Sequence, residues 1–165
     1  MKIKLTPAMC YLLGLWRSKK STKGFGIRGR KGVAAFVEES IKQGITEKGK
    51  VLYDGSEVFF YNSKFLKFAQ EFESEIDKRL KYLNDYAANY FAGVFDGTGK
   101  ITEDGKVLIR KDPIDQGILL RLGFFTRPVG KDLMVLKPKN FLEFISKWRR
   151  CNEAEANKEP KKEMG

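Results

Sequence analysis

One apolar segment with a small residue at its centre occurs twice in this chain, 79 residues apart. The first copy reads YLLGLWRSKK from Tyr11 and the second reads YFAGVFDGTG from Tyr90, so Gly14 and Gly93 take equivalent places. A glycine inside a helix costs about 1 kcal/mol relative to alanine, so glycines at both places indicate a packing demand. The repeat predicts two helices that cross closely at Gly14, Ala92 and Gly93.

Local patterns between and after the two copies predict the same order of elements in each half: helix, hairpin, helix, hairpin, helix. In the first half we expect helices over residues 7–18, 33–43 and from 63 to beyond 72, strands over 24–28, 45–53 and 57–61, and a helical linker over 78–83. In the second half we expect helices over 85–95, 113–122 and 138–148, with strands over 100–102, 106–111, 124–129 and 133–136. Asp54-Gly55 and Asp104-Gly105 are hairpin turn signals.

One such half exposes an apolar sheet face and cannot close its own core, whereas two halves related by a pseudo-twofold axis can. The expected fold is therefore α+β, built from two pseudo-symmetric αββαββα repeats with antiparallel sheets. The first repeat and the linker occupy residues 1–83, and the second repeat occupies residues 84–151. A charged tail without aromatic residues follows over residues 152–165.

Charge points to a polyanionic partner. The chain has 32 Lys and Arg residues against 21 Asp and Glu residues, which gives a formal net charge of +11. Such an excess favours nucleic acid first and an acidic membrane surface second. No apolar run approaches the length of a membrane span, and the sequence starts without a signal segment, so we expect a cytoplasmic protein without a membrane partner.

Several kinds of catalytic or metal site are excluded by composition. The chain has no histidine, which removes histidine-based acid–base chemistry, nucleophilic triads and histidine-ligated zinc. The two cysteines, Cys10 and Cys151, lie far apart and form no C-x-x-C pair. Neither a disulfide framework nor a thiolate metal site is indicated.

The two motif copies, together with the elements between them, resemble the LAGLIDADG homing endonuclease family. The clearest match runs from Phe91 to Gly99, and a weaker match runs from Leu12 to Lys20. The resemblance covers about residues 6–150. It implies a single-chain, pseudo-symmetric member whose two motif helices pack at the centre, with two saddle-shaped sheets lying across the major groove of DNA.

The resemblance also raises a question about activity. In the family, the acidic residue at the eighth motif position of each helix holds divalent metal ions at the scissile phosphates. Here the eighth positions are Lys19 and Thr98, and neither is a carboxylate. Asp96 matches the sixth position, where Arg17 is its counterpart. We therefore expect no catalytic residue, no metal site and no cofactor, with Asp96 as a displaced Mg²⁺ ligand only under the alternative of an active enzyme.

Basic residues near the motif ends and the predicted strands are the candidates for contact with nucleic acid. The stretch from Arg17 to Lys31 contains seven basic residues and no acidic one, and lysine at an eighth position would place positive charge against phosphate. Lys106 and Arg110 lie four apart and would share a strand face. The candidates are Arg17, Lys19, Lys20, Lys23, Arg28, Arg30, Lys48, Lys50, Lys106, Arg110, Arg127 and Lys131.

The sequence thus predicts a monomeric binder of double-stranded DNA with a LAGLIDADG-like fold and without endonuclease activity. Three alternatives stay open. One is an active metal-dependent endonuclease with displaced ligands, another is a maturase-like protein that binds structured RNA, and a third is a protein-interaction module.

Overall fold

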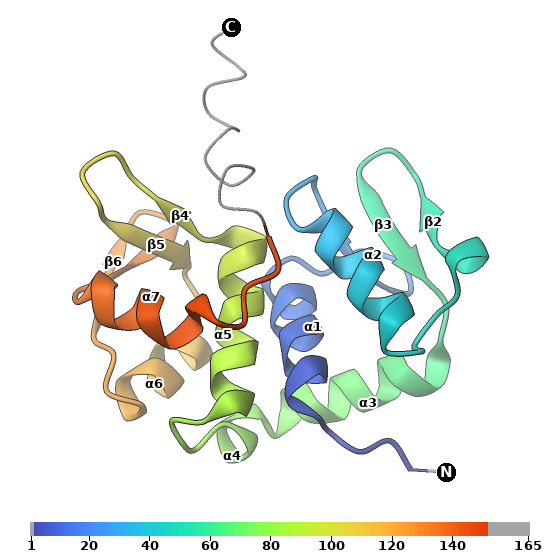
Figure 1. Cartoon of the computed structure of the whole chain (residues 1–165), viewed down its shortest axis with the longest axis horizontal. Coiled ribbons are helices and arrows are strands. Elements are labelled where there is room, and N and C mark those ends of the chain that lie inside the picture. The colour runs from blue at the N-terminus through green and yellow to red at the C-terminus, as the bar shows by residue number, and fades with distance from the viewer. Residues whose placement is uncertain (1, 152–165) are drawn as a thin grey trace, which may run out of the picture.

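The computed structural model describes residues 2–151, so the tail predicted over residues 152–165 lies outside the described residues. Figure 1 shows two sheets on either side of a central pair of helices, α1 and α5. The helices are α1 Pro7–Ser18, α2 Val33–Lys42, α3 Ser63–Ser74, α4 Ile76–Arg79, α5 Asp85–Thr98, α6 Pro113–Arg121 and α7 Pro138–Ser146. The strands are β1 Phe25–Arg28, β2 Leu52–Tyr53, β3 Glu57–Phe60, β4 Lys100–Ile101, β5 Val107–Arg110, β6 Thr126–Val129 and β7 Asp132–Val135.

Side-chain caps fix the starts of the helices where the sequence places them. The side chain of Thr6 accepts a hydrogen bond from Met9 N at 3.1 Å, ahead of α1. Asn62, Asn84 and Asp112 cap α3, α5 and α6 in the same way. Each cap satisfies a backbone N–H that has no partner within the helix. Polar side chains followed by apolar periodicity therefore predicted these starts correctly.

Both sheets are antiparallel and have related strand orders. The first sheet has the order β1-β3-β2 and the second has the order β4-β5-β7-β6. The first sheet lacks a strand equivalent to β4, and in its place a single bridge joins Lys20 to Ile27. The glycine- and lysine-rich stretch before β1 supplies too few strand-forming residues for a longer ladder. The predicted α+β class is confirmed, with this difference in the first half.

Two elements expected from the sequence cover different residues in the structure. The strand expected over residues 45–53 is reduced to β2, because a 3₁₀ turn, Lys48–Lys50, takes up the polar residues before it. Gly49 and its charged neighbours favour a turn over a pleated strand. The helical linker expected over residues 78–83 is instead α4, which ends at Arg79 and precedes irregular chain.

Aromatic side chains fill the core of each half. In the first half, the Phe25 ring packs against Trp16, Phe36, Phe60 and Phe65 with ring centroids 4.9–5.7 Å apart. In the second half, Phe141 of α7 contacts Phe91 and Phe124. The aromatic residues at helical spacing on α3 and α7 therefore serve packing, as their period predicts.

Candidate nucleic-acid interface

The central helices α1 and α5 approach so closely that only glycine fits at two places. A Cβ atom added to Gly14 would lie 2.0 Å from the carbonyl oxygen of Tyr90, and one added to Gly93 would lie 2.1 Å from the carbonyl oxygen of Tyr11. Ala92 beside them is fully buried. Because the obstructing atoms are backbone, a side chain could not be accommodated by a rotamer change. The crossing fixes how the two halves and their sheets sit relative to each other.

Beyond this crossing, the carboxyl ends of both helices carry positive charge. Lys19 at the end of α1 donates from Nζ to the carbonyl oxygen of Lys31. Lys31 in turn donates from its own Nζ to the carbonyl oxygens of Gly99 and Phe95 at the end of α5. A cation at a helix carboxyl end is favoured by the helix dipole and by its unpaired carbonyl groups. Lys31 was missed as a site residue in the sequence because its contact joins segments 68 positions apart.

The other eighth motif position, Thr98, is also engaged. Its hydroxyl donates to the carbonyl oxygen of Val94 at 3.1 Å and accepts from the backbone N–H of Arg110 at 3.4 Å. An ammonium group and a neutral hydroxyl are poor donors for Mg²⁺, which prefers carboxylate oxygens. The residues at the eighth positions therefore do not fit the metal that the family chemistry requires. Across residues 2–151, no cluster of three or more His, Cys, Asp or Glu side chains could hold a metal ion.

Asp96, the displaced ligand under the alternative, is fully buried and surrounded by donors. It accepts from Tyr11 Oη at 2.6 Å, from Arg149 Nε at 2.7 Å, and from the backbone N–H groups of Arg150 and Cys151 at 2.8 and 3.0 Å. The contacts join α1, α5 and the segment after α7. Both carboxylate oxygens are thus used in holding the chain together, which leaves Asp96 unsuited to a metal ion.

Arg17, the counterpart of Asp96 on α1, is buried in a separate charge network. Its guanidinium contacts Asp115 Oδ1 at 2.9 Å, Glu73 Oε2 at 2.9 Å and Tyr90 Oη at 3.0 Å. Tyr90 also donates to Asp115 Oδ1 at 2.7 Å. Because its donors are used and only 7 % of Arg17 is exposed, the expectation that it contacts nucleic acid is corrected. Its position next to basic residues in the sequence gave no sign of this burial.

Burial also changes the titration of this network. It raises the pKa of Asp115 to about 6, although Arg17 beside it opposes the rise. One oxygen of that carboxyl group, Oδ2, is buried without a hydrogen-bond partner. Hydrogen bonds from backbone N–H groups together with Arg17 and Arg110 outweigh desolvation at Asp112 and lower its pKa. The site therefore holds two nearby carboxyl groups with opposite pKa shifts.

The outer face of the second sheet, which points away from the core, carries basic side chains in register. Cross-strand partners share a face, and one row across all four strands is Lys100, Leu108, Met134 and Arg127. The adjacent row towards the core is Ile101, Val107, Val135 and Thr126. Lys100 and Arg127 are exposed at the two edges of the outer face, and Lys100 forms an ion pair with Asp132 at 3.3 Å. Lys100 was not among the sequence candidates.

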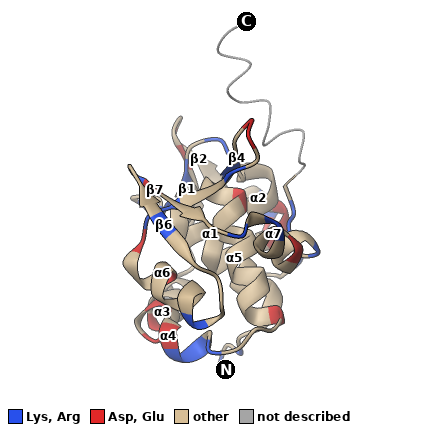
Figure 2. Ribbon diagram, turned by 90° about the vertical axis from the view of Figure 1, so that its left-hand side faces the viewer, with Lys and Arg blue, Asp and Glu red and all other residues tan. Residues whose placement is uncertain are grey.

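Other candidates near this sheet lie at its ends. Arg110 shares the outer face and forms an ion pair with Asp112 at 3.0 Å. Lys106 continues the same alternation and is exposed next to Asp104 at 3.4 Å. Lys131 is exposed in the turn between β6 and β7. Figure 2 shows the strands towards the left and top of the molecule and α7 on the right, so this basic face is separate from the helical side.

The first sheet has a more mixed outer face. Arg28 is exposed there, whereas Lys23 is paired with Asp54 at 3.0 Å and lies over the Phe59 ring. Lys20 forms an ion pair with Glu73 at 2.6 Å and lies over the Trp16 ring. These pairings reduce the charge that Lys20 and Lys23 offer to a ligand.

The remaining candidates of the first half lie off the strands. Lys48 and Lys50 stand exposed on the 3₁₀ turn before β2, which corrects their expected place on a strand. Arg30 is exposed in the loop after β1.

A small polar cavity of about 190 Å³ lies where the two halves meet. Its lining includes Lys19, Lys20, Arg28 and Arg110, with Glu73 and Asp112 as the acidic members. Nε of Arg110 is buried there without a hydrogen-bond partner. The cavity is thus cationic on balance and opens between the two sheets, next to the ends of the central helices.

Comparison with known proteins identifies the fold. No protein-family model and no curated protein sequence matches the chain. Among solved structures, that of I-DmoI in complex with DNA and Mn matches with a TM-score of 0.60 and 14% identity, covering 84% of this chain and 96% of that chain. A structure of mesophilic variants from the homing endonuclease I-DmoI gives 0.59 and 14%, covering 84% and 94%.

The N-terminal LAGLIDADG domain of DUF199/WhiA matches with a TM-score of 0.56 and 10% identity, covering 90% of this chain and 86% of that domain. These likenesses establish a LAGLIDADG-like fold, as the two motif copies predict. Among the described residues, no helix has the length and apolar character to cross a membrane.

Proposed function

From this LAGLIDADG-like fold and the charge at its helix ends, we propose that the protein binds double-stranded DNA without cleaving it. The duplex lies across the outer faces of both sheets. The observation that carries the proposal is that Lys19 and Lys31 bring ammonium groups to the carboxyl ends of α1 and α5, between the sheets. Those cations attract phosphate directly, so binding does not require a divalent metal.

The outer face of the second sheet supplies the adjoining contacts. Lys100 and Arg127 bracket Leu108 and Met134 in one cross-strand row. Basic side chains of this kind contact phosphates and fix the register of a protein on a duplex, while side chains between them can reach base edges. The likeness to I-DmoI, solved in complex with DNA, supports double-stranded DNA as the ligand.

Loss of cleavage follows from the same residues. Hydrolysis in a metal-dependent nuclease needs ligands that hold the metal at the scissile phosphate. Here one such position is Lys19, whose ammonium group donates a hydrogen bond. The other is Thr98, whose neutral hydroxyl is already hydrogen-bonded to the backbone of Val94 and Arg110. Asp96 is not available to hold a metal ion either, because four hydrogen-bond donors occupy its carboxylate.

The direct test is fluorescence anisotropy with a mixed-sequence duplex, titrated at increasing salt with either EDTA or Mg²⁺. We expect binding in both conditions, with log K falling by about 0.9 for each phosphate contacted per unit of log salt. A structured RNA of equal length serves as the competing ligand. Tighter binding to the RNA at every salt concentration would identify RNA, in place of DNA, as the ligand. No binding to either polymer at low salt would refute the proposal.

Cleavage is tested separately with supercoiled plasmid libraries and Mg²⁺ or Mn²⁺. The expected outcome is intact plasmid. Specific cleavage that depends on metal, and that disappears in an Asp96→Asn protein shown by circular dichroism to be folded, would establish the active enzyme instead.

A further inference from the structure

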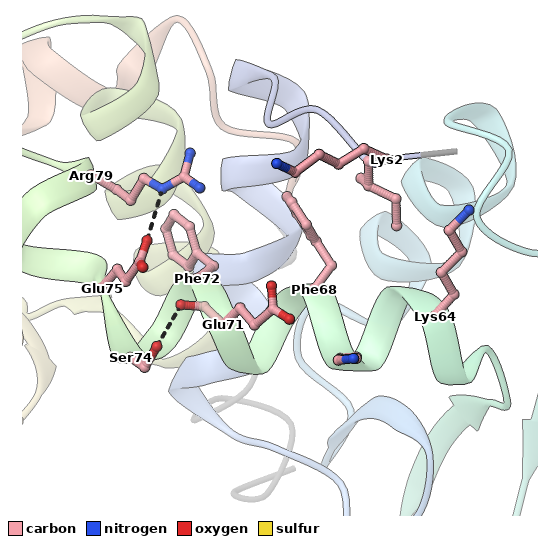
Figure 3. A pocket seen from close by; sticks show the side chains of 10 residues that line it. Lys2, Lys64, Phe68, Glu71, Phe72, Ser74, Glu75 and Arg79 are labelled. Atoms are coloured by element: carbon pink, nitrogen blue, oxygen red, sulfur yellow. Dashed lines mark hydrogen bonds and ion pairs between the residues drawn. The ribbon is translucent and has the colours of Figure 1, made fainter.

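A groove lies between the N-terminal segment and α3, in a part of the molecule that the proposed DNA interface does not use. Its volume is about 600 Å³. Figure 3 shows Phe68 and Phe72 rising from α3 into this space, with Lys2 reaching over them from the opposite side. Lys64 stands near one end and Arg79 near the other.

Helix α3 separates the groove from the DNA interface. Glu73 contacts Arg17 and Lys20 on the interface side. A helix turns by about 100° per residue, so Glu71 and Glu75, each two positions from Glu73, project from roughly the opposite side. Both of these residues line the groove. An occupant of the groove therefore need not compete with DNA.

The floor of the groove is apolar and partly open. Ile3 and Phe68 are half-buried, while Phe72 is buried. A nucleic-acid backbone would place phosphates against these side chains and gain nothing from them, whereas a peptide with apolar side chains would remove them from water. The floor thus favours a protein segment.

The rim of the groove is charged unequally. Lys2, Lys64 and Lys67 are exposed, and across residues 2–151 none of them lies within ion-pair distance of a carboxylate. At the other end, Arg79 pairs with Glu75 at 3.7 Å. Glu71 adds one exposed carboxylate to the lining, so four basic side chains stand against two acidic ones and the groove stays positive on balance. Unpaired lysines around an apolar floor are complementary to acidic side chains flanking apolar ones.

We propose that this groove docks an acidic amphipathic segment of a partner protein. Apolar side chains of the segment cover Ile3 and Phe68, and its carboxylates face Lys2, Lys64 and Lys67. The docking is independent of DNA binding, because it uses the other side of α3. The protein would then join a DNA site to a second protein.

The experiment measures anisotropy of three labelled helical peptides of about four turns, added to the full chain. The peptides share their leucine positions and carry Glu, Gln or Lys at the polar positions. We expect the Glu peptide to bind roughly tenfold more tightly than the Gln peptide, and the Lys peptide to bind least.

Variants locate the site. Lys64→Glu with Lys67→Glu should lower affinity for the Glu peptide by roughly tenfold and leave the Gln peptide unchanged. Phe68→Ser should weaken both peptides. The matched control, Lys42→Glu with Lys139→Glu on the exposed faces of α2 and α7, should change neither. Circular dichroism verifies that each variant is folded.

Three outcomes would overturn the proposal: equal affinity for the Glu and Gln peptides, no effect of the Lys64 and Lys67 double variant, or displacement of the Glu peptide by duplex DNA. The labelled duplex is measured with the same proteins. Wild-type duplex affinity in the groove variants supports two separate sites, whereas a protein that binds the Glu peptide but no duplex would refute only the DNA-binding function.

Discussion

Tyr11 donates a 2.6 Å hydrogen bond to Asp96 across the two central helices, and the equivalent pair, Tyr90 and Arg17, is joined at 3.0 Å with the opposite charge at the sixth motif position. Each pair recruits compensating partners from its surroundings. Asp96 is met by Arg149, while Arg17 is met by Glu73 and Asp115. The repeated motif thus keeps its geometry and exchanges its charge, which explains why neither sixth position is free for other chemistry.

Replacing Gly14 by alanine should destabilise the protein by about 1–3 kcal/mol or more, as overpacking does in a rigid core. The added Cβ would lie 2.0 Å from a backbone oxygen that cannot move aside. Urea denaturation measures the change. The control is Gly117→Ala, at an exposed position of α6 where nothing lies within 4 Å, and it should stabilise by about 0.5–1 kcal/mol. Equal stability of Gly14→Ala and the wild type would contradict the close crossing.

Asp96→Asn should cost about 3–5 kcal/mol, because it leaves the Arg149 guanidinium buried and short of its counter-charge. An amide would also turn a donor towards one of the groups that now donate to the carboxylate. Thermal and urea unfolding give the measurement, with the exposed substitution Asp77→Asn as the matched control. A metal ligand without structural duties would instead tolerate this change, so unchanged stability would favour the displaced-ligand alternative.

The free energy of unfolding should fall by about 2 kcal/mol between pH 4 and pH 6 through Asp115 alone. Burial raises the pKa of this carboxyl group from 3.8 to about 6. Over that interval the folded state binds more protons than the unfolded state, so its stability is present at the lower pH and is lost as the pH rises.

Urea titrations of the wild type and Asp115→Asn across this interval isolate the effect of this network, since carboxyl groups outside it contribute equally to both proteins. The stability of the wild type relative to Asp115→Asn should fall by about 2 kcal/mol from pH 4 to pH 6. Parallel curves would show that Arg17 keeps Asp115 ionised throughout and would refute the prediction.

Removing the outer-face cations of the second sheet should weaken DNA binding in a salt-dependent way. Lys100→Ala and Arg127→Ala each remove one exposed charge from the row that also holds Leu108 and Met134. Each should reduce the slope of log K against log salt by about 0.9 if it removes one phosphate contact. Lys42→Ala and Lys139→Ala, exposed on α2 and α7, are the controls and should not change the slope. Equal effects of all four would indicate nonspecific attraction in place of a defined face.

Much of the fold could be predicted from local signals. Capping residues such as Asn84 and Asp112 mark helix starts because they satisfy backbone donors of the first turn. Turn glycines such as Gly55 and Gly105 adopt positive φ where the hairpins reverse. The strand expected over residues 45–53 is shortened to β2 because Lys48–Lys50 forms a tight turn, and no periodic signal distinguishes a turn from a strand over so few residues.

The candidate site was harder to predict, since it depends on contacts between distant segments. Arg17 and Lys19 belong to one basic stretch of sequence, yet the Arg17 side chain points inward and joins a buried charge network, whereas Lys19 donates to the carbonyl oxygen of Lys31. Two positions along a helix differ in direction by about 200°, and only the packed partner decides which direction is inside. Lys31 and Lys100 were missed or undervalued for the same reason.

The sequence by itself determined the paired helices, because residue type and spacing carry that information, and it shows no carboxylate at Lys19 or Thr98, the two positions that the LAGLIDADG resemblance singles out. The tertiary structure decided which charges are buried, paired or exposed. Asp96 became a buried anchor and Lys31 a cap on the second central helix, since desolvation and hydrogen bonding depend on groups that the chain brings together only on folding.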